Sequence, residues 1–161
     1  MSALKTIDRI IGMVLRAIPM ACLAALFVIL LGNVVSRYFQ IWSIAWFDEI
    51  VEALFAVTVF VGAAALWREH EHFRVDWLEM ALSLKPRRAL AVLTTALSLA
   101  FLVLLAVKGY DLAARSRAVT PILGVPTAYI YATIPIAASI MALYSVRDLI
   151  VALRGFAKPS D

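Results

Sequence analysis

Four long apolar segments constrain what this chain can fold into. Each contains about 20 mostly apolar residues, the length that an α-helix needs to cross the hydrocarbon core of a bilayer. The segments are residues 17–36, 46–67, 89–108 and 128–146. Lipid tolerates only helices and closed barrels. The sequence therefore predicts an all-α membrane protein, with residues 1–161 forming a single four-span membrane domain.

Composition agrees with this fold class. The chain is 64% hydrophobic, whereas a soluble domain is usually near half apolar. The net charge of +4 comes from basic residues in the short segments between spans. Such charges report topology rather than nucleic-acid binding, and no nucleic-acid partner is expected. Cys22 is the only cysteine and can form no internal disulfide.

The N-terminal segment is predicted to lead into an uncleaved first span. Residues 1–16 have helical apolar periodicity with interleaved charges, which predicts an amphipathic lead-in at the membrane surface. The apolar run that follows is longer than a signal-peptide core of about 7–15 residues and has no A-x-A cleavage site. Most of the 15 Lys and Arg lie on the side of the N-terminus. The positive-inside rule therefore predicts cytoplasmic N- and C-termini.

The second span carries acids, which are rare in lipid and usually face protein or water. Asp48 and Glu49 begin it, and Glu52 lies one turn deeper. At about 100° per residue, two of these acids share one helix face with small side chains, which favours close packing of another helix. The members of that face are Glu49, Glu52, Ala53, Ala56, Phe60 and Ala63.

Arg37 closes the first span at about the depth where Glu49 opens the second. The two side chains are therefore predicted to pair across the hairpin. Three roles stay open for Arg37 and the acids: a structural clamp, a surface for a partner subunit, and an ion or proton pathway.

A short amphipathic segment separates the second and third spans. Phe73, Trp77, Met80 and Leu84 recur on one narrow helical face, and Asp76 resembles a helix N-terminal cap. The segment is too short to span a bilayer. It is predicted to be an interfacial helix over residues 73–84, either simply lying on the membrane or bracing a larger partner.

No pattern in the sequence indicates catalysis. His70 and His72 diverge on a helix, and no cysteine or third histidine completes a metal set. No nucleophile–base pair or phosphate-binding loop occurs. We therefore expect no enzyme activity, no catalytic residue, no metal site and no cofactor.

Pro135 within the fourth span predicts a kink.

An ordered set of residues resembles one family. Asn33, Arg37 and Tyr38 close the first span, and Trp46, Asp48 and Glu49 open the second. Further members are Gly62-Ala63, Arg68, His72, Val75-Asp76-Trp77, Pro86, Arg88, Leu123-Gly124-Val125-Pro126, Tyr129 and Pro135. Together they resemble the small integral membrane subunit (DctQ type) of tripartite ATP-independent periplasmic (TRAP) transporters. Asp48 departs from the glutamate more common there, but the acid is kept.

The resemblance implies a heteromeric importer in the bacterial inner membrane. A periplasmic substrate-binding protein captures a small organic acid, and a large multi-span transport subunit moves it with a sodium gradient. The small subunit implied by the resemblance is a scaffold for the large one and a possible docking point for the periplasmic protein. Two other functions stay open: a self-sufficient small transporter or channel that uses Glu52, and a membrane anchor of a redox enzyme.

Overall fold

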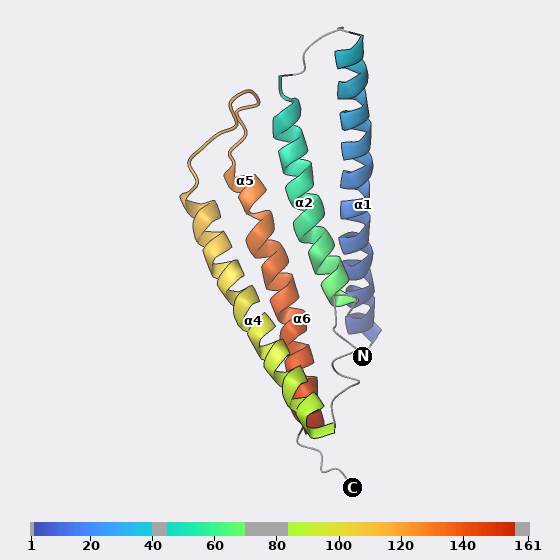
Figure 1. Ribbon diagram of the computed structural model, residues 1–161, viewed down its shortest axis with the longest axis vertical. Coiled ribbons are helices and arrows are strands. Elements are labelled where there is room, and N and C mark those ends of the chain that lie inside the picture. The colour runs from blue at the N-terminus through green and yellow to red at the C-terminus, as the bar shows by residue number, and fades with distance from the viewer. Residues whose placement is uncertain (1, 40–44, 70–83, 157–161) are drawn as a thin grey trace.

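The computed structural model describes residues 2–39, 45–69 and 84–156. Within them the chain is helical, with one isolated antiparallel bridge between Val119 and Pro126 (Figure 1). The helices are α1 (Ser2–Tyr38), α2 (Phe47–Arg68), α4 (Leu84–Arg115), α5 (Ala128–Tyr131) and α6 (Thr133–Phe156). Four helical stretches are long and apolar enough to cross a membrane: Asp8–Tyr38, Phe47–Arg68, Ala89–Arg115 and Ala128–Arg154. The prediction of an all-helical chain with four helices of membrane-spanning length and apolarity is thereby confirmed.

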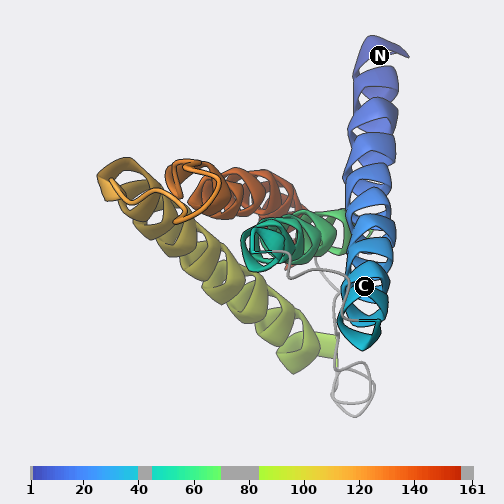
Figure 2. The same ribbon diagram turned by 90° about the horizontal axis from the view of Figure 1, so that it is seen from above.

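The helices form an open row rather than a closed bundle. α1 packs chiefly on α2, α2 packs on α6, and α6 packs on α4. Figure 2 shows α2 between α1 and α6, with α4 on the far side. Because α1 has one main neighbour, it exposes large apolar side chains such as Phe27 and Val28. Surfaces of this kind face lipid or another protein.

Small residues let the helices approach where they meet. Ala64 of α2 and Ala138 of α6 are both 0% exposed. Ala64 belongs to a buried cluster with Leu15 of α1, Leu102 of α4, and Ala137 and Met141 of α6. Transmembrane helices associate through close packing of this type, since lipid tails are as apolar as leucine side chains. The core therefore joins all four spans.

The first helix differs from its prediction. α1 is continuous from Ser2, so the predicted lead-in is part of the spanning helix rather than a separate helix on the membrane surface. Pro19 consequently lies inside α1 instead of in its first turn. A Cβ built on Gly62 of α2 would lie 3.7 Å from the Pro19 Cβ. Neighbouring helices commonly make a proline tolerable within a span.

The fourth span contains a short interruption near Pro135, the residue at which the sequence predicts a kink. α5 ends at Tyr131 and α6 begins at Thr133, so regular helix is interrupted at Ala132. Pro135 has no N–H to donate to the carbonyl of Tyr131, which weakens the helix at this place. Gly109 of α4 packs against the same region, because a Cβ on it would lie 2.8 Å from Cγ2 of Ile134. This interruption is thus covered by a close α4–α6 contact.

Two predictions remain beyond what the structure describes. The interfacial helix falls on residues 73–83, outside the described residues, and Leu84 is already the first residue of α4. The start of α1 and the end of α6 lie at the same end of the molecule (Figure 1). Which side of the membrane that end faces stays a prediction.

Candidate functional site

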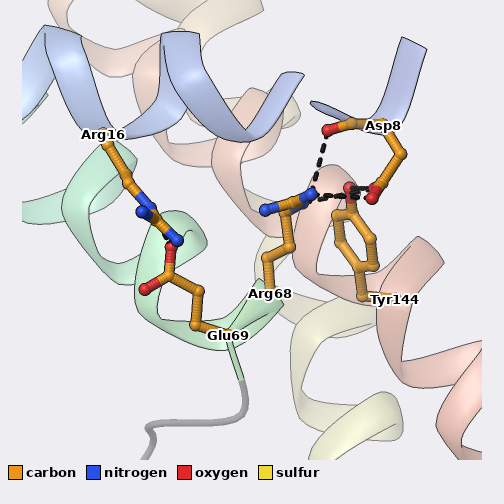
Figure 3. A network of polar contacts seen from close by, with 5 residues as sticks. All are labelled: Asp8, Arg16, Arg68, Glu69 and Tyr144. Atoms are coloured by element: carbon orange, nitrogen blue, oxygen red, sulfur yellow. Dashed lines mark hydrogen bonds and ion pairs between the residues drawn. The ribbon is translucent and has the colours of Figure 1, made fainter. Parts of the chain in front are cut away.

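A polar network joins three helices at the end of the molecule where α1 begins (Figure 3). Arg68, the last residue of α2, donates its Nε–H to Oδ1 of Asp8 at 3.2 Å and an Nη2–H to Oδ2 at 2.7 Å. It also donates to the Asp8 backbone oxygen at 3.0 Å. The hydroxyl of Tyr144 in α6 donates to Asp8 Oδ1 at 3.0 Å. One aspartate of α1 therefore links the end of α2 to the middle of α6.

Gly12 makes room for this network. It is buried on α1, and a Cβ built on it would collide with the guanidinium of Arg68. The Arg68 side chain is only 17% exposed. A side chain at position 12 would push the guanidinium away from Asp8. The glycine thus permits the close approach between Arg68 and α1.

A second ion pair lies on the same helix pair. Nε of Arg16, two turns along α1 from Asp8, contacts Oε1 of Glu69, the residue that follows α2 (Figure 3). Exposed ion pairs add little stability in water. In the Arg68–Asp8 pair, however, one guanidinium donates to both oxygens of one carboxylate. Such an arrangement fixes the direction of the contact as well as its distance. We therefore assign these contacts to setting the position of α1 on α2.

Glu49 forms a separate contact at the opposite end. Its Oε1 accepts the backbone N–H of Ile122 at 2.7 Å, and its Oε2 accepts that of Leu123 at 2.9 Å. Both donors belong to the connection between α4 and α5. One carboxylate thereby ties this connection to the first turn of α2.

The α4–α5 connection, residues 116–127, is also ordered by its own hydrogen bonds. Thr120 N–H donates to Val125 O at 2.9 Å, and Thr127 N–H donates to Ala118 O at 3.0 Å. Gly124 has φ +64°, a conformation that favours glycine. The loop is therefore a compact turn. Its exposed side chains include several apolar ones: Val119, Ile122, Leu123 and Val125.

The predicted pairing of Arg37 with Glu49 is not what the structure contains. Both carboxylate oxygens of Glu49 contact the α4–α5 connection, and Arg37 is exposed. Equal depth on adjacent helices suggested the pair. It could not show that a loop from far along the chain packs onto the start of α2.

Glu52 lies on the outward side of α2. It is exposed, and the described residues provide it with no hydrogen bond or ion pair. Ala53, Ala56 and Ala63 of the predicted small-residue face are half-buried. Glu52 thus lies at the border between that packed face and an exposed stripe, which consists of Asp48, Glu52, Phe55, Val59 and Leu66.

Of the network residues, Arg68 was named only as part of the family resemblance, and Asp8 and Tyr144 were not singled out from the sequence. Asp8 and Tyr144 are separated by 136 positions, and no local pattern connects them. The available signal was that Asp8, Arg68 and the last turns of the fourth span all belong at one end of a four-span topology.

His70 and His72 lie outside the described residues. Among the His, Cys, Asp and Glu that the structure describes, no group of three could hold a metal ion.

Comparison with known protein families gives one match. Residues 26–155 match the family described as tripartite ATP-independent periplasmic transporters, DctQ component. The match contains Glu49, Glu52 and the α4–α5 connection, whereas Asp8 and Gly12 precede it. No curated protein matches the chain. The family is a transporter component rather than an enzyme family, and it functions with a larger membrane subunit and a binding protein. Because the match covers well over half of its residues, the chain belongs to the DctQ family, the small multi-pass membrane component of TRAP transporters.

Proposed function

We propose that the chain is a scaffold subunit of a sodium-driven importer of small organic acids in the bacterial inner membrane. It would hold the large transport subunit in place without chemistry of its own. The driving ion, substrate class and membrane follow from the family resemblance. The scaffold role has support from one observation in the molecule itself, the exposed Glu52 on a spanning helix.

Glu52 is the strongest indication of a protein partner. A carboxylate within a spanning helix is costly in lipid and normally faces protein or water. The described residues leave Glu52 uncovered, on a stripe that also carries Phe55 and Val59. A helix of the large subunit with a basic or amide side chain would satisfy the acid and cover the apolar residues. The open helix row leaves this face of α2 accessible.

The test is co-purification of the large subunit through a tag on this chain. We expect Glu52→Leu to weaken the complex by about tenfold or more, since hydrogen bonds to charged groups contribute about 1.5–3 kcal/mol. Glu52→Gln, which can still hydrogen-bond, should weaken it less. Asp111→Asn is the matched control, because Asp111 lies on α4 and pairs with Arg115. Unchanged recovery of the large subunit and unchanged uptake with Glu52→Leu would contradict the scaffold role of this stripe.

The α4–α5 connection supports a second role, docking of the periplasmic protein. It lies at the end opposite the termini (Figure 1), is held by Glu49, and exposes Ile122 and Leu123. A rigid apolar turn offers a partner a surface that needs little ordering on binding. Leu123→Asp should lower uptake while leaving recovery of the large subunit unchanged. Full uptake with Leu123→Asp would argue against docking at this turn.

The alternative of a self-sufficient transporter has a direct test. Substrate-dependent sodium uptake by the purified chain alone in liposomes, abolished by Glu52→Gln, would replace the scaffold proposal.

A further inference from the structure

A groove runs along α1 at the end of the molecule where the chain begins. Its volume is about 560 Å³. All but one of its lining residues belong to α1, and the exception is Arg68 of α2. The α1 residues are Asp8, Arg9, Gly12, Met13, Arg16, Ala17 and Met20. This surface is separate from Glu52 and from the α4–α5 connection, and the proposed function does not use it.

The chemistry of the groove changes along its length. From Arg9 to Met20 the helix rises about 16 Å, at about 1.5 Å per residue. Arg9 lies toward the start of the spanning stretch, whereas Ala17 and Met20 lie deeper along it. Met13 is 64% exposed and Met20 is 63% exposed. The groove is therefore cationic from Arg9 to Arg16, with Met13 between the two arginines, and apolar beyond them at Ala17 and Met20.

The cationic part retains capacity for an anion. The lining contains three arginines and a single aspartate, and that aspartate is already held by Arg68 and Tyr144. Arg9 is exposed, and no carboxylate among the described residues pairs with it. Arg16 uses its Nε–H on Glu69. A guanidinium has five N–H donors, so Arg16 can donate to a further ligand without losing Glu69.

We infer that this groove binds one anionic phospholipid. Arg9 and Arg16 would hold the headgroup phosphate, because planar guanidinium groups match phosphate oxygens well. An acyl chain would lie along Met13, Ala17 and Met20, where flexible thioether side chains adapt to an irregular partner. Basic pockets at the ends of membrane helices bind anionic headgroups in this manner. A free phosphate ion would leave the apolar half of the groove unused.

The test uses the full-length chain with the membrane subunits that co-purify with it. Native mass spectrometry would measure binding of phosphatidylglycerol, with phosphatidylcholine as the zwitterionic comparison. We expect the anionic lipid to bind with a stoichiometry of one per chain and to resist displacement by millimolar inorganic phosphate. Arg9→Gln should weaken it about fivefold, and Arg9→Gln with Arg16→Gln about thirtyfold, since each arginine near the surface contributes about 1 kcal/mol.

Two further variants separate a specific site from general basicity and from misfolding. Arg154→Gln is the matched control, because Arg154 is an exposed arginine near the end of α6, at the same end of the molecule but outside the groove. It should leave binding unchanged. Ala17→Phe would fill the apolar part without altering an arginine, and it should also weaken binding.

Three results would overturn the inference. The first is equal binding of phosphatidylcholine. The second is equal loss of phosphatidylglycerol with Arg154→Gln and Arg9→Gln. The third is displacement of the lipid by inorganic phosphate, which would identify a simple anion site instead.

Discussion

The guanidinium of Arg68 lies against the backbone of Gly12, where even a Cβ atom would displace it. This contact brings the end of α2 onto α1 and puts Arg68 in reach of Asp8. Position 12 therefore affects the polar network by the room that it leaves for the Arg68 guanidinium, and not by carrying a charge.

Gly12→Ala should lower the thermal stability of the protein in detergent, although alanine is the better helix former. Gly32 provides the matched control on the same helix, since a Cβ there would meet nothing within 4 Å. Gly32→Ala should raise stability by about 0.5–1 kcal/mol. Thermal unfolding of both variants checks the prediction. Equal shifts for the two would show that Arg68 moves aside without loss.

Asp8→Asn and Tyr144→Phe should have non-additive effects on stability. Tyr144→Phe removes one hydrogen bond to the Asp8 carboxylate, and Asp8→Asn replaces that carboxylate with an amide that has one acceptor oxygen. Residues in one network couple. The double variant should therefore lose less than the two single variants added together. The measurement is a double-mutant cycle by thermal unfolding. Strict additivity would mean that Tyr144 contributes independently of Asp8.

Glu49→Gln should loosen the α4–α5 connection. The amide keeps one acceptor oxygen where the carboxylate has two, so one of the hydrogen bonds from Ile122 and Leu123 is lost. Limited proteolysis between residues 116 and 127 should become faster. Asp48→Asn, which changes the neighbouring exposed acid, should leave the rate unchanged. Comparable cleavage of both variants would exclude Glu49 as the residue that holds this turn.

Ala138→Leu should destabilise the protein by about 1–3 kcal/mol, because extra methylenes in a close-packed site force the surrounding helices apart. Ala138 is 0% exposed. Ser139→Leu is the control, since Ser139 is the adjacent residue and is exposed. It should be tolerated. Thermal unfolding distinguishes the two, and a tolerated Ala138→Leu would indicate a looser contact around α6 than the burial implies.

The four long apolar helices and the weak point in the fourth one could be predicted from the sequence, because each depends on local properties. Run length and hydropathy determine the four spans, and the missing N–H of Pro135 weakens the helix near Ala132. The continuity of α1 was missed because interleaved charges in residues 1–16 suggested a surface helix.

The contacts between elements could not be predicted in the same way. Neither the row order of the helices nor the contact from Glu49 to Leu123 leaves a periodic signal, since both depend on which distant segments meet. The exposure of Glu52 could be predicted only in part. Its presence in a span was evident, but whether it faced a neighbour within the chain depended on the packing of α2.

The row of helices has a consequence for how the chain assembles in the membrane. α1 with α2 and α4 with α6 each form a hairpin of sequential neighbours, and the two hairpins meet mainly at a single seam between α2 and α6. Each hairpin can be completed from local partners before the seam closes. A chain divided between residues 69 and 84 should therefore yield two halves that reassociate when expressed together.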